Sequence, residues 1–284
     1  MERLDEFISA IDSHEKKETR NVFLRYLKKW PWFLFFSLIG FATGYFFYKY
    51  SPNQYSVSSR ILIKNQDKSF NAFGRSSGQN MVQKINIENQ IGILRSYTLY
   101  NRALTNLNWD HSWYRKELLY EKQLYKNPPF ELEVPPNAIN AENVMLEIEP
   151  LNGDEFILKV EAETRMNGRL QEINIEERKN FGEPIVNEFF NFKLHNGYGA
   201  PGQIFLLKFN SLHTLTSQYL GRTAIEPADN NSDLISITIV GNVPQKDADF
   251  INELNNVFIQ FGMENENQNS EISVKFIDNQ LSRI

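Results

Sequence analysis

The sequence predicts an α+β fold: one N-terminal transmembrane helix, then a mostly antiparallel sheet with flanking helices, then the start of a long coiled-coil-like helix. Three observations predict it. Residues 30–48 form an apolar run without a single charge. Short runs that alternate between apolar and polar residues recur after it, some around Asn-Gly pairs, as in antiparallel hairpins. Apolar residues at helical spacing recur after residue 86 and again after Pro244.

The apolar run reads WPWFLFFSLIGFATGYFFY and is interpreted as a membrane span. As a helix it is roughly 28 Å long, close to the hydrocarbon thickness of a bilayer. A cleaved signal peptide fits less well, because the leader is long and no small-residue cleavage site follows. A buried core helix would show a polar face. The predicted membrane anchor comprises Trp30, Trp32, Phe33, Leu34, Phe35, Phe36, Leu38, Ile39, Phe41, Tyr45, Phe46, Phe47 and Tyr48.

Flanking charge predicts the orientation of this span. Arg25, Lys28 and Lys29 lie directly before it, whereas the far side has Lys49 and then Arg60. The positive-inside rule therefore places residues 1–29 in the cytoplasm as a short tail and the rest outside it.

Residues 49–107 are expected to form the first part of an α+β domain next to the membrane. The stretch 54–64 alternates as a half-buried strand, and the polar segment 65–82 is interpreted as a loop. Ile87, Ile91 and Leu94 follow at helical spacing, and Ser96 is a candidate N-cap for a second helix.

Residues 108–210 are interpreted as a β-rich extension of that domain. The stretch 108–142 contains two Pro-Pro pairs and is expected to be irregular. Alternating runs on either side of Asn152-Gly153 predict a hairpin, and Asn167-Gly168 is a second turn signal. Short strands are expected at 190–194 and 204–209, joined by a glycine-rich turn.

Residues 211–264 are expected to complete the α+β domain. A short helix at 212–220 and strands at 222–226 and 234–240 precede a helix that begins at Pro244. Residues 265–284, which begin with the polar break NENQN, are interpreted as the start of a long exported helix. Its predicted oligomer seam has 3-4-3 spacing and comprises Val274, Ile277, Leu281 and Ile284. The abrupt end at Ile284 suggests a truncated chain.

Composition argues against several function classes. Lys plus Arg total 30 against 35 for Asp plus Glu, and this acidic balance disfavours nucleic-acid binding. The absence of cysteine excludes disulfides, thiol nucleophiles and cysteine metal sites. His14, His111, His195 and His213 lack metal-ligand spacing. Acidic residues such as Glu161 and Glu163 are interpreted as solvated strand faces rather than a glycosidase pair. We therefore expect no catalytic, metal or cofactor site in this segment.

Four local patterns, in this order, resemble one family. They are a membrane helix followed by Pro52 and the strand YSVSSRILI, the helix text IENQIGILRS, the strand LISITIV before a Pro/Ala helix, and a long helix from Ser270. They resemble the bacterial polysaccharide co-polymerases, the Wzz-type chain-length determinants, and most closely the exported part of those linked to a tyrosine autokinase (Wzc-like). The matching positions are Pro52, Gln90, Ile91, Leu94, Ser96, Pro244 and Ala248.

The resemblance implies a non-catalytic subunit of the bacterial inner membrane with a periplasmic main domain. Such subunits form closed homo-oligomers around the path of a lipid-linked polysaccharide, such as O-antigen, capsule or exopolysaccharide, and regulate its chain length or export. The implied partners are further copies of the chain, the membrane and the polymerase or export machinery. A lipid-linked glycan is also a possible partner, and no nucleic acid or cofactor is implied.

The chain departs from the family in two ways. It has no second, Pro-associated membrane helix, and it lacks the phosphate-binding G-x-x-x-x-G-K-[ST] loop that a kinase would need. Three alternatives therefore stay open. They are the N-terminal region of a larger tyrosine autokinase, a single-pass sensor ectodomain, and a membrane-anchored hydrolase.

Overall fold

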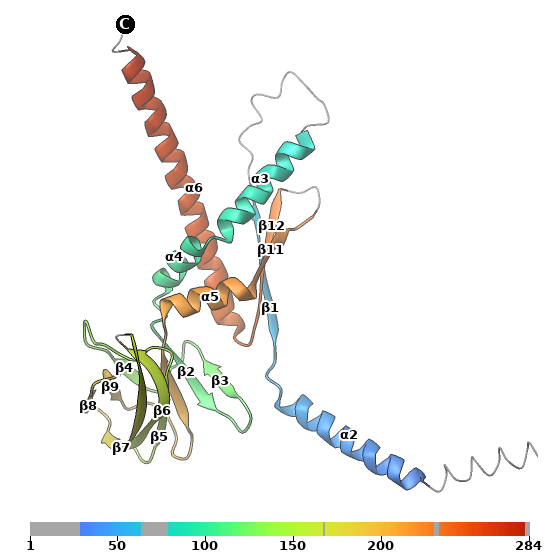
Figure 1. The fold of residues 1–284 in the computed structure, drawn as a ribbon, viewed down its shortest axis with the longest axis vertical. Helices are drawn as coiled ribbons and strands as arrows, with labels where there is room; N and C mark the ends of the chain where they lie inside the picture. The colour runs from blue at the N-terminus through green and yellow to red at the C-terminus, as the bar shows by residue number, and fades with distance from the viewer. Residues whose placement is uncertain (1–28, 64–78, 167, 230–232, 282–284) are drawn as a thin grey trace, which may run out of the picture. The chain divides into compact units, whose positions relative to one another are not determined.

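The computed structural model describes residues 29–63, 79–166, 168–229 and 233–281 (Figure 1). The chain divides into two units, Met1–Ser51 and Pro52–Ile284. The first contains helix α2 (Trp30–Tyr50), and the second contains every other element described below.

Helix α2 confirms the helix expected in the apolar run. Pro31 lies in its first turn, where the missing N–H costs least, and Ser51 ends the helix by donating its N–H to the Phe47 carbonyl at 2.9 Å. All of its described side chains are exposed. The stretch Trp30–Lys49 is long and apolar enough to cross a membrane, judged by length and composition.

The second unit contains an antiparallel sheet in the order β1-β12-β11. Its strands are β1 (Tyr55–Leu62), β11 (Thr223–Pro227) and β12 (Leu234–Gly241). Ile237 on the central strand lies opposite Ser59 on one side and Ile225 on the other. Alternate residues of β12, including Ile235, Ile237 and Ile239, are fully buried, so one face of this sheet carries the core.

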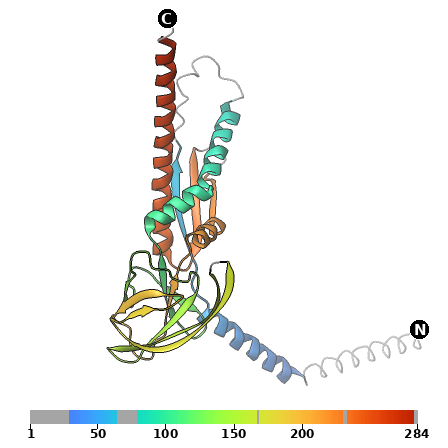
Figure 2. The same cartoon turned by 60° about the vertical axis from the view of Figure 1, so that its left-hand side comes forward.

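Four helices build the core on that face (Figure 2). They are α3 (Gln79–Leu94), α4 (Tyr97–Leu107), α5 (Leu212–Arg222) and α6 (Pro244–Leu281). The expected cap is confirmed, because the Ser96 hydroxyl accepts a hydrogen bond from the Leu99 N–H. Helix α3 begins at Gln79, so the predicted loop extends too far, and residues 65–78 of that loop lie outside the described part of the chain.

The predicted break in the last helix is wrong, because α6 runs without interruption through residues 265–269. The described side chains of this stretch, 265–268, are exposed to solvent. Asn, Glu and Gln are tolerated in an exposed helix at a cost below about 1 kcal/mol each, unlike proline. A polar run therefore changes what α6 faces without ending it.

Residues 111–209 form two antiparallel sheets around a second core. The larger sheet has the order β3-β2-β10-β5-β6-β7 and the smaller one β4-β9-β8. Their strands are β2 (His111–Lys116), β3 (Glu121–Leu124), β4 (Glu131–Glu133), β5 (Met145–Pro150), β6 (Glu155–Met166), β7 (Arg169–Asn180), β8 (Pro184–Val186), β9 (Asn191–His195) and β10 (Phe205–Phe209).

Much of the chain's phenylalanine lies in this second core. Phe130, Phe156, Phe190, Phe192 and Phe205 are all at most 1% exposed. Their rings contact one another or Phe181 and Phe209, with centroids 4.8–6.4 Å apart. Aromatic burial of this kind stabilises a small β core beyond its area alone.

The predicted hairpin at Asn152-Gly153 is confirmed, since β5 and β6 pair antiparallel around it. The second turn signal is also confirmed by the pairing of β6 with β7. By contrast, the expectation of an irregular segment at 108–142 is wrong, because β2, β3 and β4 lie within it. These strands are short. β2 and β4 pair with β10 and β9, which are distant in the sequence, and β3 is an edge strand that pairs with β2. The long-range pairings are not revealed by local patterns.

Candidate binding pocket

Most of the motif positions named above support the fold rather than face a ligand. Ile91 and Leu94 of α3 belong to the core that α6 also enters, and Leu94 is fully buried. Pro244 is the first residue of α6, Ala248 is half-buried one turn later, and Gln90 is half-buried on α3.

The predicted seam lies on the exposed end of α6. Val274, Ile277 and Leu281 are between 55% and 64% exposed, and Ile284 lies outside the described residues. Of the three charges predicted to lie on the cytoplasmic side, Lys29 directly precedes α2, whereas Arg25 and Lys28 lie outside the described residues.

The three described histidines lie apart on separate elements. His195 Nε2 is 2.9 Å from Glu133, and His213 Nδ1 is 2.9 Å from the Tyr97 hydroxyl. Among the described residues, no group of three or more His, Asp or Glu side chains is arranged to hold a metal ion.

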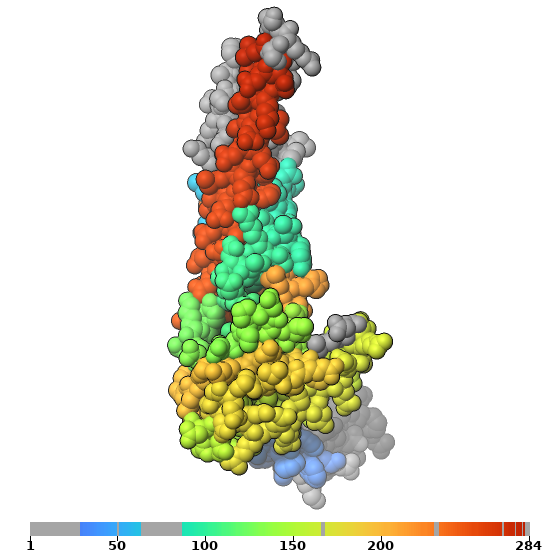
Figure 3. Space-filling model, turned by 90° about the vertical axis from the view of Figure 1, so that its left-hand side faces the viewer, coloured from blue at the N-terminus to red at the C-terminus, as the bar shows by residue number. Residues whose placement is uncertain are grey.

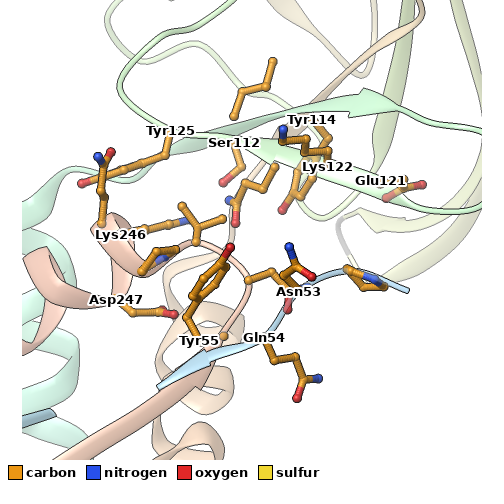
Figure 4. Close-up of a pocket in the computed structure, with 18 of the residues that line it drawn as sticks. Asn53, Gln54, Tyr55, Ser112, Tyr114, Glu121, Lys122, Tyr125, Lys246 and Asp247 are labelled. Atoms are coloured by element: carbon orange, nitrogen blue, oxygen red, sulfur yellow. The ribbon is translucent and has the colours of Figure 1, made fainter. Parts of the chain in front are cut away.

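A cavity of about 970 Å³ lies where the two cores of the second unit meet (Figure 4). Its walls are the β2–β3 hairpin, the start of α6, the end of α5 and the segment Pro52–Tyr55 that leads into β1. Figure 4 shows Tyr55, Tyr114 and Lys246 facing the same space from three of these walls. Each of the four walls comes from a different part of the chain.

Contacts from the β2–β3 hairpin side to α6 hold the cavity's outer wall in place. The Tyr125 hydroxyl donates to Asp249 at 2.7 Å, and Lys126 pairs with the same carboxylate at 2.8 Å. These two donors hold the pKa of Asp249 below its usual range. Burial and Asp249 together raise the pKa of Tyr125, which keeps its hydroxyl protonated as a donor.

An ion pair between Arg222 and Asp247 stabilises the part of the cavity wall formed by α5 and α6. Arg222 donates to both oxygens of the Asp247 carboxylate at 3.0 Å, and to the Val240 carbonyl. Asp247 is 2% exposed and also accepts from the Tyr219 hydroxyl. A Cβ at Gly241 would overlap both the guanidinium and the carboxylate, so glycine is needed there for the pair to form.

Lys246 is a buried cationic residue in the wall of this cavity. It is 6% exposed, and within the described part of the chain its ammonium has no hydrogen bond or ion pair. The ammonium lies over the Trp109 ring, 4.6 Å from its centroid. Such a contact contributes about 2 kcal/mol at best, less than the several kcal/mol that burying an ammonium costs.

The electrostatic surroundings make this ammonium still less stable. Burial lowers the pKa of Lys246 to about 8, and repulsion from Lys208 and Arg222 adds to the shift against the attraction of Asp247. Lys208 lies half-buried on β10, 5.8 Å from the Tyr114 ring centroid, and burial lowers its pKa as well. The first turn of α6 also carries the positive end of the helix dipole.

The described lining residues are rich in cations and tyrosines. Four are cationic and two are anionic, so the wall carries a formal charge of +2 in a chain whose net charge is −5. No histidine lies among them, and the Ser112 hydroxyl accepts a hydrogen bond from the Asn210 side chain at 2.8 Å. Six tyrosines add rings and hydroxyls: Tyr55, Tyr114, Tyr120, Tyr125, Tyr198 and Tyr219.

Sequence reasoning missed this pocket, although one signal was present. Lys246 occupies the first turn of a helix, where the macrodipole favours acidic residues and disfavours a cation. Lys208 places a charged side chain within the otherwise apolar strand FLLKF, which is also unfavourable. Neither signal shows that the two residues meet. In comparisons with known proteins, no family model matches this chain, and no curated protein matches it at a significant level.

Proposed function

We propose that this chain is a non-catalytic, membrane-anchored subunit of a polysaccharide co-polymerase. It assembles with further copies of itself and regulates the chain length or export of a lipid-linked cell-surface polysaccharide. The four ordered sequence patterns support this proposal, since they bracket the chain from the apolar helix to the end of α6.

The observation that carries the proposal is the exposed apolar row on α6. The helix continues beyond the helices that pack on its first half, as the red surface in Figure 3 does beyond the teal one. Val274, Ile277 and Leu281 repeat at the spacing of a coiled-coil seam and are more than half exposed. A second copy of the same helix would cover this row, because identical seams are self-complementary.

The anchor in this proposal is α2. Its length, its exposed apolar side chains and its terminal aromatic residues suit a membrane span. The excess of Lys and Arg before it favours an N-terminus in the cytoplasm and a periplasmic location for Pro52 onward. A pocket lined by cations and tyrosines is consistent with a subunit that holds a polymer in position.

The test is the oligomeric state of the full chain in detergent, together with the glycan profile of cells that carry it. We expect one large assembly by analytical ultracentrifugation, and a variant with Val274, Ile277 and Leu281 all changed to Ser should sediment as smaller species. In cells that express this variant, the polysaccharide length distribution should shift.

The matched control changes the charged neighbours Lys275 and Asp278 to Ser, which removes polar groups from the same turns of the helix. This control should keep the assembly and the glycan profile. A monomeric unaltered chain, or a normal glycan profile after gene deletion, would contradict the proposal.

A further inference from the structure

We propose that the pocket between the β2–β3 hairpin and the first turn of α6 binds a phosphoryl group, held chiefly by Lys246 and Lys208. This inference concerns a ligand site and does not depend on the proposed co-polymerase function. It begins from Lys246, whose ammonium is buried, faces the cavity and has no partner of its own among the described residues. Buried charges in proteins are ordinarily paired, so the natural explanation is a partner that arrives from solution.

The carboxylates near Lys246 do not fill this role. Asp247 is engaged by Arg222 and by the Tyr219 hydroxyl, and Asp249 by Lys126 and Tyr125. Glu121 of β3 attracts Lys208, yet Lys208 forms no ion pair with it in the described part of the chain. Two lysines therefore approach one polar cavity with a mutual repulsion that an anion between them would relieve.

The helix start adds a second attraction for an anion. The first N–H groups of a helix have no partner within it, and the dipole places partial positive charge there. Helix N-termini commonly bind phosphate for this reason. The positive end of the dipole repels the Lys246 ammonium. A bound anion would be attracted both by the ammonium and by the dipole.

Charge and size favour a phosphoryl group over a carboxylate. A phosphomonoester carries about −1.5 to −2 charges at neutral pH, which matches the formal +2 of the lining residues, whereas a carboxylate carries one. Lysine is also a common phosphate ligand. A cavity of about 970 Å³ has room for a group attached to the phosphate, and the tyrosine rings and hydroxyls offer it apolar and polar contacts.

The phosphoryl group has two possible sources, a soluble phosphate compound and a lipid headgroup. The pocket wall includes Asn53, Gln54 and Tyr55, which follow the apolar helix by three to five residues in the sequence. Both sources present the same chemistry to Lys246 and Lys208, so the experiment separates them by the probe used.

The test uses the full chain in detergent, titrated calorimetrically with inorganic phosphate and diphosphate, with acetate as the carboxylate comparison. In a parallel experiment, the chain is reconstituted in phosphatidylcholine vesicles with or without phosphatidic acid. Binding is then measured as the difference in unfolding temperature between the two preparations. Binding of the soluble anions supports a soluble source. An effect of phosphatidic acid alone supports a headgroup.

The variants are Lys246→Met and Lys208→Met, which keep an apolar stem and remove the charge. We expect Lys246→Met to weaken phosphoryl binding at least tenfold and Lys208→Met to weaken it several-fold. The control Lys159→Met, at an exposed position on β6 away from the pocket, should bind as the unaltered chain does. Equal binding by Lys246→Met, or no response to any of the three phosphoryl probes, would overturn the proposal.

A measurement on the unaltered chain keeps the test independent of variant folding. Inorganic phosphate becomes more fully dianionic from pH 7.5 to 9.5, which by itself would strengthen binding, whereas Lys246, with a pKa of about 8, loses most of its charge over this range. Binding should therefore weaken roughly tenfold between these two pH values. Affinity that stays constant over the same interval would contradict a role for Lys246.

Discussion

The two halves of α6 follow the same apolar periodicity but have opposite surroundings. In the first half, Phe250, Ile251, Leu254 and Val257 are at most 1% exposed and pack against the sheet and α4. In the second half, Val274, Ile277 and Leu281 are more than half exposed. Periodicity therefore identifies the apolar face of a helix, and only the fold shows whether the chain itself covers that face. The five predictions below begin with large expected effects in the buried half of α6 and finish with a small one at its exposed end.

The largest effect is expected for Leu254→Ala. Leu254 is fully buried in the core shared by α3, α4, α6 and the first sheet, so the truncation leaves a cavity. We expect a loss of about 3 kcal/mol in the free energy of unfolding, measured by chemical denaturation. The control Ile259→Ala, about half exposed on the same helix, should lose less than about 1 kcal/mol. Equal losses would remove the distinction between covered and uncovered positions.

The buried charge at the base of α6 predicts a stability that rises with pH. The folded pKa of Lys246, about 8, lies below its ordinary value of 10.5, so between these values the unfolded chain binds more protons than the folded one. Stability should therefore increase from pH 8 towards 10.5, by up to about 3 kcal/mol from this group.

Lys208, whose pKa is also lowered, adds a rise of the same sign, so the informative quantity is the difference between variants. Lys246→Met should remove its share of the rise, whereas Lys275→Met, at the exposed end of α6, should keep the whole of it. Thermal unfolding of the ligand-free chain across this pH range measures both, and identical slopes would mean that Lys246 keeps its ordinary pKa.

An intermediate effect is expected for Asp247→Asn. The change leaves the Arg222 guanidinium without its carboxylate, in a setting where Asp247 is almost completely buried and Arg222 is 39% exposed on its side chain. Partial solvent access to the arginine limits the expected loss to about 2 kcal/mol. Chemical denaturation should show this loss, and Asp278→Asn on the exposed turn should leave the midpoint unchanged. A neutral Asp247→Asn would mean that the ion pair contributes no net stability.

A small effect is expected for Glu264→Gln, near the point where contacts between α4 and α6 end. Glu264 accepts two hydrogen bonds from Arg102, at 2.7 and 3.0 Å, and these hold the pKa of Glu264 below its usual range. Because the folded pKa is lowered, the stabilisation is present above the ordinary glutamate pKa and is lost as the pH falls through the lowered value. The unfolding temperature should fall slightly at low salt and not at high salt. A drop that persists at high salt would point to a packing role instead.

The smallest effect on folding is expected for Ile277→Ser. Its exposed side chain contributes little to a single copy, so unfolding of the dilute chain should change by less than about 0.5 kcal/mol. Assembly, measured by sedimentation of the same preparation, should nevertheless weaken. A loss comparable to that of Leu254→Ala would show that the end of α6 is covered within one copy.

The sequence was informative where structure is local. The apolar helix, the Ser96 cap, the hairpin at Asn152-Gly153 and the start of α6 at Pro244 each depend on residues close together in the chain. It failed for β2, which pairs with β10 about ninety residues away, and for β3, an edge strand that pairs with β2. It failed for the polar run in α6 because exposed polar residues were interpreted as a break.

The binding pocket was unpredictable for the same physical reason. Tyr55, Lys208 and Lys246 are far apart in the sequence and line one cavity, beside which Tyr125 of the β2–β3 hairpin side contacts Asp249 of α6. The unfavourable placement of Lys246 in a first helical turn was visible in the sequence. The burial of Lys246 was not visible in the sequence, because it depends on Trp109 and on strand β10 of the second core.

The two ends of the β-rich region are held side by side. The Asn210 N–H donates to the Asp110 carbonyl at 2.7 Å, and its side-chain amide donates to the Trp109 carbonyl at 2.8 Å. The chain thus leaves the α/β core at Asn108 and returns to it at Ser211 through one narrow junction. A segment attached in this way can be gained, exchanged or trimmed during evolution without altering the register of β1, β11 and β12.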